Sequence, residues 1–272
     1  MIEWVSDEHL VVDGTPFVLA PIEVNRARAD VDAGSLLLRK ARWMVERYVE
    51  LAPLVQGGNI FELGIYEGGS AALLALLCRP RHLIAVDLVA RTPAVLDQFL
   101  RDRDLTGSVH PHYGVDQADR GALTGLLAAV LGDEPLDLVI DDASHLVDES
   151  TASFNTLFPR LRPGGLYVLE DWSCRHDRES ALDRAMQSDP ALRARVAERV
   201  AEQGIDPEGP PMSRLLLEIV LASAYEPAVV AEVQSIRGGW AIVRRGPAPL
   251  GDDFDIRTAY GRLGRVLLGE PG

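Results

Sequence analysis

The sequence predicts a doubly wound α/β fold, in which a mostly parallel sheet of seven strands carries helices on both faces and closes with an antiparallel hairpin. Three observations predict it. Short apolar runs alternate with helical stretches from Asn59 onward, a glycine-containing turn follows the first run, and two strand-like runs joined by a tight turn come last. With 272 residues, 47% of them hydrophobic, the chain can bury one large core and still carry extensions.

Residues 1–57 are predicted to form an appendage that consists of a hairpin and a helix. Asp13 and Gly14 lie between two apolar runs, which is a strong hairpin signal. From Asp32 to about Leu54, apolar residues recur at helical spacing, so a helix is expected there.

Residues 58–246 are predicted to form the main domain, built on five β/α repeats. The five expected strands are NIFELG at 59–64, HLIAVDL at 82–88, SVHPHYG at 108–114, LDLVIDD at 136–142 and GLYVLED at 165–171. The stretches between them have helical periodicity, which is typical of a parallel sheet covered on both faces.

The remainder of the main domain is predicted to contain a polar insertion at about 173–211, a helix at 212–224 and the closing hairpin. The hairpin strands are VVAEVQSI at 229–236 and WAIVRR at 240–245. Residues 247–272 form a weakly periodic tail.

The bulk composition argues against several classes of protein. The net charge is −14, from 27 basic and 41 acidic residues, which disfavours nucleic acid as a partner. No apolar run approaches the length of a membrane span, and the N-terminus lacks the features of a secretory signal. The two cysteines, Cys78 and Cys174, lie far apart and suit a reducing cytoplasm.

The turn FELGIYEGGSA at 61–71 indicates a ligand site. Gly64, Gly68 and Gly69 connect a strand to a helix, where the backbone can approach a ligand closely. The spacing is not that of a turn that seats a pyrophosphate, and Glu62 and Glu67 disfavour a phosphate further. A positively charged ligand without phosphate fits better.

Asp87 ends the second strand, where a carboxylate in such a fold can bind the hydroxyls of a ribose. A ribose without a pyrophosphate indicates S-adenosylmethionine. The alternative is that the glycines and Asp87 serve only turn and capping roles. After the third strand, Asp116 and Gln117 are candidates for contact with adenine, and the alternative is that they cap the next helix.

Two acidic pairs follow the fourth and fifth strands. The carboxyl ends of neighbouring parallel strands meet at one edge, so Asp141, Asp142, Glu170 and Asp171 are expected to converge. Carboxylates packed so closely must protonate in part or bind a cation, and oxygen ligands favour Mg²⁺.

Asp142, Glu170 and Asp171 are the expected metal ligands. The ion would bind two adjacent substrate hydroxyls, and His145 would act as the general base. In the alternative interpretation, Asp142 caps a helix, His145 is structural and the acids are solvated.

Four segments together resemble a known family: IFELGIYEGGSAALLA, LIAVDL, VIDDASH and FPRLRPGGLYVLEDW. They are similar to class I S-adenosylmethionine-dependent methyltransferases, which have a Rossmann-like fold. More narrowly, they resemble the metal-dependent sugar O-methyltransferases of the macrocin O-methyltransferase family, to which the cephalosporin hydroxylase family is similar. The resemblance covers roughly residues 58–172.

The resemblance implies roles for individual residues. The family's metal ligands correspond to Asp142, Glu170 and Asp171, and its proposed base corresponds to His145. The positions that match the family's cofactor site are Glu62, Gly64, Tyr66, Gly68, Ser70, Asp87, Asp116, Gln117 and, beside the methionine portion, Asp141. Family members methylate deoxysugar hydroxyls and form oligomers whose N-terminal segments help to build the acceptor site.

The function expected from the sequence is therefore Mg²⁺-dependent transfer of a methyl group from S-adenosylmethionine to a sugar hydroxyl, by a cytoplasmic homo-oligomer. The alternatives are an NAD(P)-dependent oxidoreductase and a noncatalytic S-adenosylmethionine-binding protein. Trp172, Arg175 and His176 begin the insertion, which is expected either to cover the acceptor or to form an exposed loop. Asn25, Arg26 and Arg28 are further candidates for the acceptor site, with a solvated surface role as the alternative.

Overall fold

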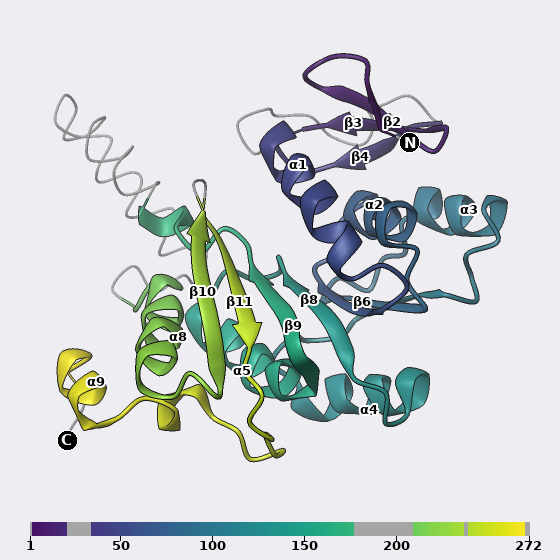
Figure 1. The fold of residues 1–272 in the computed structure, drawn as a ribbon. Helices are drawn as coiled ribbons and strands as arrows, with labels where there is room; N and C mark the ends of the chain where they lie inside the picture. The colour runs from purple at the N-terminus through teal and green to yellow at the C-terminus, as the bar shows by residue number, and fades with distance from the viewer. Residues whose placement is uncertain (1, 21–33, 177–208, 237–238, 270–272) are drawn as a thin grey trace, which may run out of the picture.

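A computed structural model describes residues 2–20, 34–176, 209–236 and 239–269 (Figure 1). Its main sheet has seven strands in the order β10-β11-β9-β8-β5-β6-β7, and a second sheet has the order β1-β2-β3-β4. The predicted doubly wound α/β class, with its mostly parallel sheet and its antiparallel C-terminal hairpin, is confirmed.

Five strands of the main sheet are parallel, and most of their residues are buried except in the edge strand β7. They are β5 (Asn59–Leu63), β6 (His82–Asp87), β7 (Val109–Tyr113), β8 (Leu136–Asp141) and β9 (Leu161–Leu169). Antiparallel β11 (Trp240–Arg245) pairs with β9, and β10 (Val230–Ile236) pairs with β11. Strands that are covered on both faces require continuous apolar runs, and runs such as Leu138–Ile140 supply them.

Helices cover both faces of this sheet (Figure 1). On one side lie α2 (Gly69–Cys78) and α3 (Ala94–Asp102), and on the other lie α4 (Arg120–Leu131), α5 (Val147–Leu157) and α8 (Ser213–Tyr225). Short helices complete the described chain: η2 (Ala52–Leu54), η3 (Phe158–Arg160), η4 (Ile256–Thr258) and α9 (Arg262–Leu267). The strand order reverses between β5 and β8, so a ligand site is expected at their carboxyl ends.

The N-terminal segment forms β1 (Ile2–Trp4), β2 (His9–Val12), β3 (Thr15–Leu19), β4 (Leu36–Leu38) and α1 (Arg42–Leu51). The predicted hairpin is confirmed, because β2 and β3 pair across Asp13 and Gly14, which both have positive φ angles. The predicted helix is wrong over its first part. Leu36–Leu38 instead forms a strand parallel to β3. The prediction failed because a short run of buried leucines has no periodicity that separates a strand from a helix.

The N-terminal sheet stacks on the outside of α2 and shares one hydrophobic core with it (Figure 1). The contact is close, since a Cβ atom added to Gly69 would lie 2.1 Å from the main-chain oxygen of Leu37. On the opposite flank, Tyr48 of α1 packs edge-on against Trp240 of β11, with ring centroids 5.0 Å apart. Strand β4 and helix α1 thereby border the carboxyl ends of the central strands.

Within the described ranges, every helix is too short or too polar to cross a lipid bilayer.

Candidate active site

A cavity of about 640 Å³ opens at the carboxyl ends of β5, β6, β7 and β8. That volume is within the usual range for small-molecule sites. Its lining contains members of both predicted sites, the glycine turn and the acidic pairs, together with residues that follow β4. The polar lining residues are Arg39, Lys40, Tyr66, Glu67, Ser70, Asp87, Arg91, Asp116, Gln117, Asp142, Ser144, His145, Glu149 and Asp171.

The glycine turn brings the end of β5 against the end of β8. Gly64 has a φ of 98°, and a Cβ atom there would lie 2.2 Å from the main-chain oxygen of Asp142. Gly68, with a φ of 86°, is the N-cap of α2, and a Cβ atom there would lie 2.7 Å from Leu96 Cβ. Both positions exclude a side chain, and the backbone of Gly64 forms part of the cavity wall.

Asp87 holds the glycine turn in place. Its Oδ2 accepts hydrogen bonds from the main-chain N–H groups of Ile65 (3.0 Å) and Tyr66 (2.8 Å), and its Oδ1 accepts one from Val89 (2.8 Å). A carboxylate offers about four acceptor positions. Asp87 can therefore order the turn and still accept a hydroxyl of a ligand in the cavity, and its role as a ribose ligand stays a prediction.

Two other predicted cofactor residues, Tyr66 on this turn and Glu62 in β5, differ in their surroundings. The side chain of Tyr66 lies on the cavity wall, and the residue is 56% exposed. Glu62 is 1% exposed, and its Oε2 has no hydrogen-bond partner. Burial raises the pKa of Glu62 to about 8, although a hydrogen bond from Ser70 and the charge of Lys40 both act to lower it.

The two residues predicted to contact adenine lie on the cavity wall but already have other partners. Asp116 Oδ1 accepts a hydrogen bond from the Ala118 N–H at 2.8 Å. The buried amide of Gln117 accepts from the Ser144 N–H at 2.8 Å and donates to Ser153 Oγ at 3.3 Å. Their contact with adenine stays a prediction. The helix cap considered as the alternative belongs to Asp119, which accepts from the N–H of Ala122.

The acidic pair after β8 is split between the two faces of the sheet, because successive side chains of a strand point in opposite directions. Asp141 is buried on the α5 side, where its Oδ2 accepts hydrogen bonds from Ser153 and Tyr167, both at 3.0 Å. Burial raises the pKa of Asp141 to about 6, against the effect of these hydrogen bonds. Its predicted proximity to the cofactor is untested.

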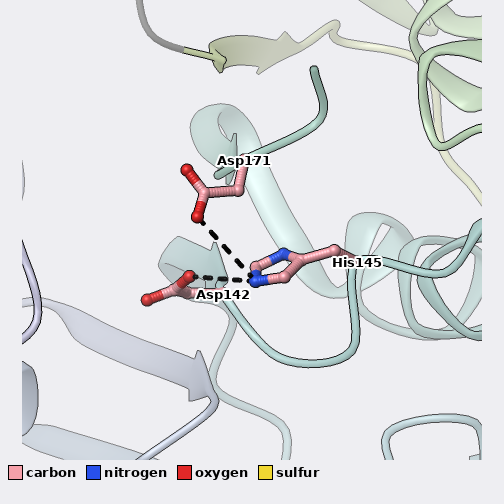
Figure 2. Close-up of side chains that lie close together, drawn as sticks. All are labelled: Asp142, His145 and Asp171. Carbon is pink, nitrogen blue, oxygen red and sulfur yellow. Dashed lines mark ion pairs between the residues drawn. The ribbon is translucent and has the colours of Figure 1, made fainter. Parts of the chain in front are cut away.

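Three of the predicted site residues come together at the end of the cavity: Asp142, His145 and Asp171 (Figure 2). His145 Nε2 lies 3.8 Å from Asp142 Oδ1 and 3.9 Å from Asp171 Oδ2. His145 and Asp171 both have left-handed backbones, with φ angles of 55° and 53°. Such conformations are uncommon for residues other than glycine and gather at functional sites.

These three side chains suit a metal ion. One ligand atom from each lies within 4.8 Å of the other two. The two carboxylates are donors that suit Mg²⁺ or Mn²⁺, whereas an imidazole suits softer divalent metals. The Nδ1 atom of His145 is buried without a hydrogen-bond partner among the described residues, so Nε2 is the nitrogen that faces the two acids.

Glu170, the third predicted metal ligand, has a different environment. It is fully buried, and its carboxylate accepts hydrogen bonds from Lys40 Nζ at 2.6 Å and from the hydroxyl of Tyr48. Lys40 Nζ also donates to Asp142 Oδ2 at 2.6 Å. Metal binding by Glu170 stays a prediction.

Burial and neighbouring charges have opposite effects on the pKa values of Lys40 and Glu170. Burial acts to lower the pKa of Lys40, but the charges of Asp142 and Glu170 outweigh it and raise that pKa. Burial raises the pKa of Glu170, and Lys40 opposes that rise. Lys40 Nζ lies 2.6 Å from one oxygen of each carboxylate, so Lys40 is protonated and forms an ion pair with both.

Lys40 and Tyr48 are the site residues that the sequence reasoning missed. Both fall in the segment predicted as one continuous helix, so neither drew attention as a partner of the acids. One signal was available: Lys40 is the only lysine in the chain, and the other 26 basic residues are arginines.

Some predicted residues fall on parts of the chain that the structure does not describe. Asn25, Arg26 and Arg28, and most of the insertion at 173–211, lie outside the described residues. At the described start of the insertion, Arg175 donates to the main-chain oxygen of Gly209 at 2.9 Å and His176 is 2.7 Å from Ser213 Oγ. Their predicted role at the acceptor site is not tested.

Comparison with known proteins matches a family model over part of the chain. Residues 61–172 match the family model described as a methyltransferase domain, a segment that runs from β5 to just past the second acidic pair. This segment of the chain is similar to that family.

Curated relatives match only short parts of the chain. One is an 8-demethyl-8-alpha-L-rhamnosyl tetracenomycin-C 2'-O-methyltransferase from Streptomyces olivaceus, 52% identical over 56 residues, which are 21% of this chain and 14% of that protein. Another is a demethylmacrocin O-methyltransferase from Streptomyces fradiae, 57% identical over 56 residues, which are 21% of this chain and 13% of that protein.

Among solved structures, a methyltransferase from the mycinamycin biosynthetic pathway, in complex with Mg, SAH and mycinamycin VI, aligns at 21% identity with a TM-score of 0.49. The alignment covers 79% of this chain and 50% of that one.

Proposed function

We propose that the chain is an S-adenosylmethionine-dependent O-methyltransferase that acts on a sugar hydroxyl of a glycosylated small molecule. The observation that carries the proposal is a single cavity that runs from the glycine turn and Asp87 to Asp142, His145 and Asp171, inside the segment that matches a methyltransferase-domain model. The choice of a sugar acceptor is supported by the local identity to an O-methyltransferase named for a rhamnosyl-bearing compound.

In this proposal the methyl donor lies along the glycine turn. Residues of the turn between Gly64 and Ser70 line the cavity, and Asp87 keeps acceptor positions for a ribose. Asp116 and Gln117 are proposed on the adenine side, Asp141 is proposed near the methionine portion, and Glu62 is proposed as part of the cofactor loop.

The acceptor hydroxyl is proposed to react at the acidic end of the cavity. As the bond from the donor sulfur to the methyl carbon breaks and the bond from the acceptor oxygen to that carbon forms, the hydroxyl proton moves to His145 Nε2. Asp142 and Asp171, at 3.8 and 3.9 Å from Nε2, would stabilise the imidazolium that results. S-adenosylhomocysteine is the leaving product.

A divalent cation such as Mg²⁺ would, when bound, orient the acceptor and lower the pKa of its hydroxyl. Asp142, Glu170 and Asp171 are its proposed ligands, and the ligand atoms of Asp142 and Asp171 lie within 4.8 Å of each other. We also propose that the protein is a cytoplasmic homo-oligomer. The low cysteine content supports the compartment, and light scattering on the purified protein tests the oligomer.

The test combines ligand binding with methyl transfer. Calorimetry should detect binding of S-adenosylhomocysteine and none of NAD, and the reverse result would favour the oxidoreductase alternative. With methyl-labelled S-adenosylmethionine, Mg²⁺ and a panel of glycosides, we expect product formation that EDTA abolishes. The His145→Ala variant should lose about 10²-fold to 10⁴-fold in rate.

The matched control is His9→Ala, on an exposed histidine of β2 that is absent from the cavity wall, and it should keep full activity. Cofactor binding with no methyl transfer to any glycoside, in the wild type as in His145→Ala and in EDTA, would favour the noncatalytic binding protein.

A further inference from the structure

The loop that carries His145 is bound by a side chain from a separate connection of the fold. This loop runs over residues 142–146, from the end of β8 to the start of α5, and Asp142 and His145 both lie on it (Figure 2). Between them is Ser144, whose main-chain N–H donates to Gln117 Oε1 at 2.8 Å. Gln117 lies between β7 and α4 and is 6% exposed. A buried amide therefore binds the residue next to the proposed base.

The amide of Gln117 is in turn anchored in the core. Its Nε2 donates to Ser153 Oγ of α5 at 3.3 Å, and the Ser153 hydroxyl donates to Asp141 Oδ2 at 3.0 Å. Ser153 and Asp141 are 0% and 1% exposed. The hydrogen bonds thus form a chain from the buried end of β8, through α5 and Gln117, to the backbone of the loop.

We propose that Gln117 is a positioning residue, which holds this loop so that His145 Nε2 faces Asp142 and Asp171. The inference rests on the proposed function, because it concerns the base of that same reaction. It is compatible with the proposed contact to adenine, since Gln117 Oε1 has two lone pairs and Ser144 uses one of them. Gln117 can therefore contact adenine and hold Ser144 at the same time.

The backbone of His145 explains why the loop needs support. Its φ of 55° lies in the left-handed region, which is unfavourable for residues other than glycine and persists only where the surroundings enforce it. Its ring Nδ1 is buried without a hydrogen-bond partner among the described residues, so the direction of the ring depends on the backbone. Ser144 ties that backbone on both sides, because its N–H donates to Gln117 and its Oγ accepts from the Leu146 N–H at 3.2 Å.

The residue type at position 117 fits this role. The position needs an acceptor for a main-chain N–H and a donor for a hydroxyl, and a side-chain amide supplies both without a charge. A carboxylate would accept from Ser144 but could not donate to Ser153. It would also place a second negative charge near Asp141, whose Oδ1 lies 3.5 Å from Gln117 Nε2.

The test compares Gln117→Met, which removes the amide, with the matched control Asn155→Leu. Asn155 is another partly buried amide with two partners, since its Oδ1 accepts from the Ile256 N–H at 2.9 Å and its Nδ2 donates to Asp255 at 3.0 Å. It is absent from the cavity wall. Both variants therefore lose a similar pair of hydrogen bonds, but only Gln117→Met changes the support of the His145 loop.

The first readout is kcat with S-adenosylmethionine and a glycoside that the wild type methylates, both at saturation. We expect Gln117→Met to lower kcat by about 10-fold to 100-fold, because a displacement of about 1 Å at a reacting group can cost about 10²-fold. Its dissociation constant for S-adenosylhomocysteine should rise by less than about tenfold, the most that one neutral hydrogen bond contributes. Asn155→Leu should leave both unchanged. An unchanged kcat in Gln117→Met would overturn the inference, because Gln117 would then act on the donor alone.

The second readout needs neither cofactor nor turnover. The chain has 6 histidines, and the ring Cε1–Hε1 signal of His145 in a ¹H–¹³C NMR spectrum is assigned from its loss in His145→Ala. We expect this signal to shift or broaden in Gln117→Met and to keep its position in Asn155→Leu, because only Gln117→Met removes the acceptor of the Ser144 N–H. A His145 signal that is the same in Gln117→Met as in the wild type would also overturn the inference.

Ser153→Ala replaces Gln117→Met if that variant does not fold. It removes the acceptor of Gln117 Nε2, so the amide can turn away from Ser144. We expect a smaller change of the His145 signal in the same direction, and an unmoved signal would count against the inference. If the wild type transfers no methyl group while the His145 signal responds as expected, the proposed function fails and the hold of Gln117 on the loop stands.

Discussion

Glu62 makes the stability of the protein depend on pH in a way that one substitution can reveal. The residue is 1% exposed, has one oxygen without a hydrogen-bond partner, and has a pKa raised by burial from 4.5 to about 8. Because the native pKa lies above the unfolded value, the native state holds a proton that the unfolded state releases between pH 4.5 and about pH 8. Stability is therefore highest below this window and falls as pH rises through it.

The magnitude follows from the difference between the two pKa values of Glu62. Each unit of difference between the two pKa values corresponds to about 1.4 kcal/mol in the free energy of unfolding. Glu62 therefore lowers the free energy of unfolding by less than about 1 kcal/mol at pH 5, by about 3 kcal/mol at pH 7 and by about 5 kcal/mol above pH 8. Glu62→Gln removes this titration, so its advantage over the wild type should grow with pH by these amounts.

The assay is urea unfolding of both proteins at several pH values between about 5 and 9, without metal or cofactor. Glu3→Gln is the matched control, because Glu3 is an exposed residue of β1, and we expect it to stay within about 0.5 kcal/mol of the wild type throughout. A difference between Glu62→Gln and the wild type that is constant across this pH range would refute the reasoning, because Glu62 would then be ionised in the fold throughout the range.

Three other predictions concern the site and its supports. Gly64→Ala should destabilise the fold by about 1–3 kcal/mol in urea unfolding, because the added Cβ has no space and the φ angle is positive. The control is Gly125→Ala, at an open position of helix α4, which should stabilise the fold by about 0.5–1 kcal/mol. Equal effects would contradict the packing at the turn. Tyr48→Phe should cost about 1–3 kcal/mol, because one oxygen of the buried Glu170 loses its donor; an unchanged melting curve would show that the bond is absent. Asp87→Asn should weaken binding of S-adenosylhomocysteine by about tenfold or more in calorimetry, because an amide cannot accept all three backbone N–H groups; unchanged affinity would argue against Asp87 as a support of the donor site.

Much of the fold was predictable because the governing signals are local. The runs that became β5, β6, β7, β8 and β9 are short, apolar and separated by helical stretches, and that alternation admits few arrangements other than a parallel sheet. The same logic predicted that residues at the ends of β8 and β9 would meet, and Asp142, His145 and Asp171 do so. Leu36–Leu38 was mispredicted because a run of three buried leucines has no distinguishing period.

The sequence by itself thus determined the sheet, the glycine turn and the edge at which the acids gather, because strand and helix periods are properties of neighbouring residues. Only the tertiary structure decided which partner each acid has. Asp141 turned toward Ser153 and Tyr167, and Glu170 was enclosed by Lys40 and Tyr48, groups that lie 130 and 122 residues away. The pairing of a buried charge depends on what the folded core brings within about 3 Å of it, and no local pattern in the chain contains that information.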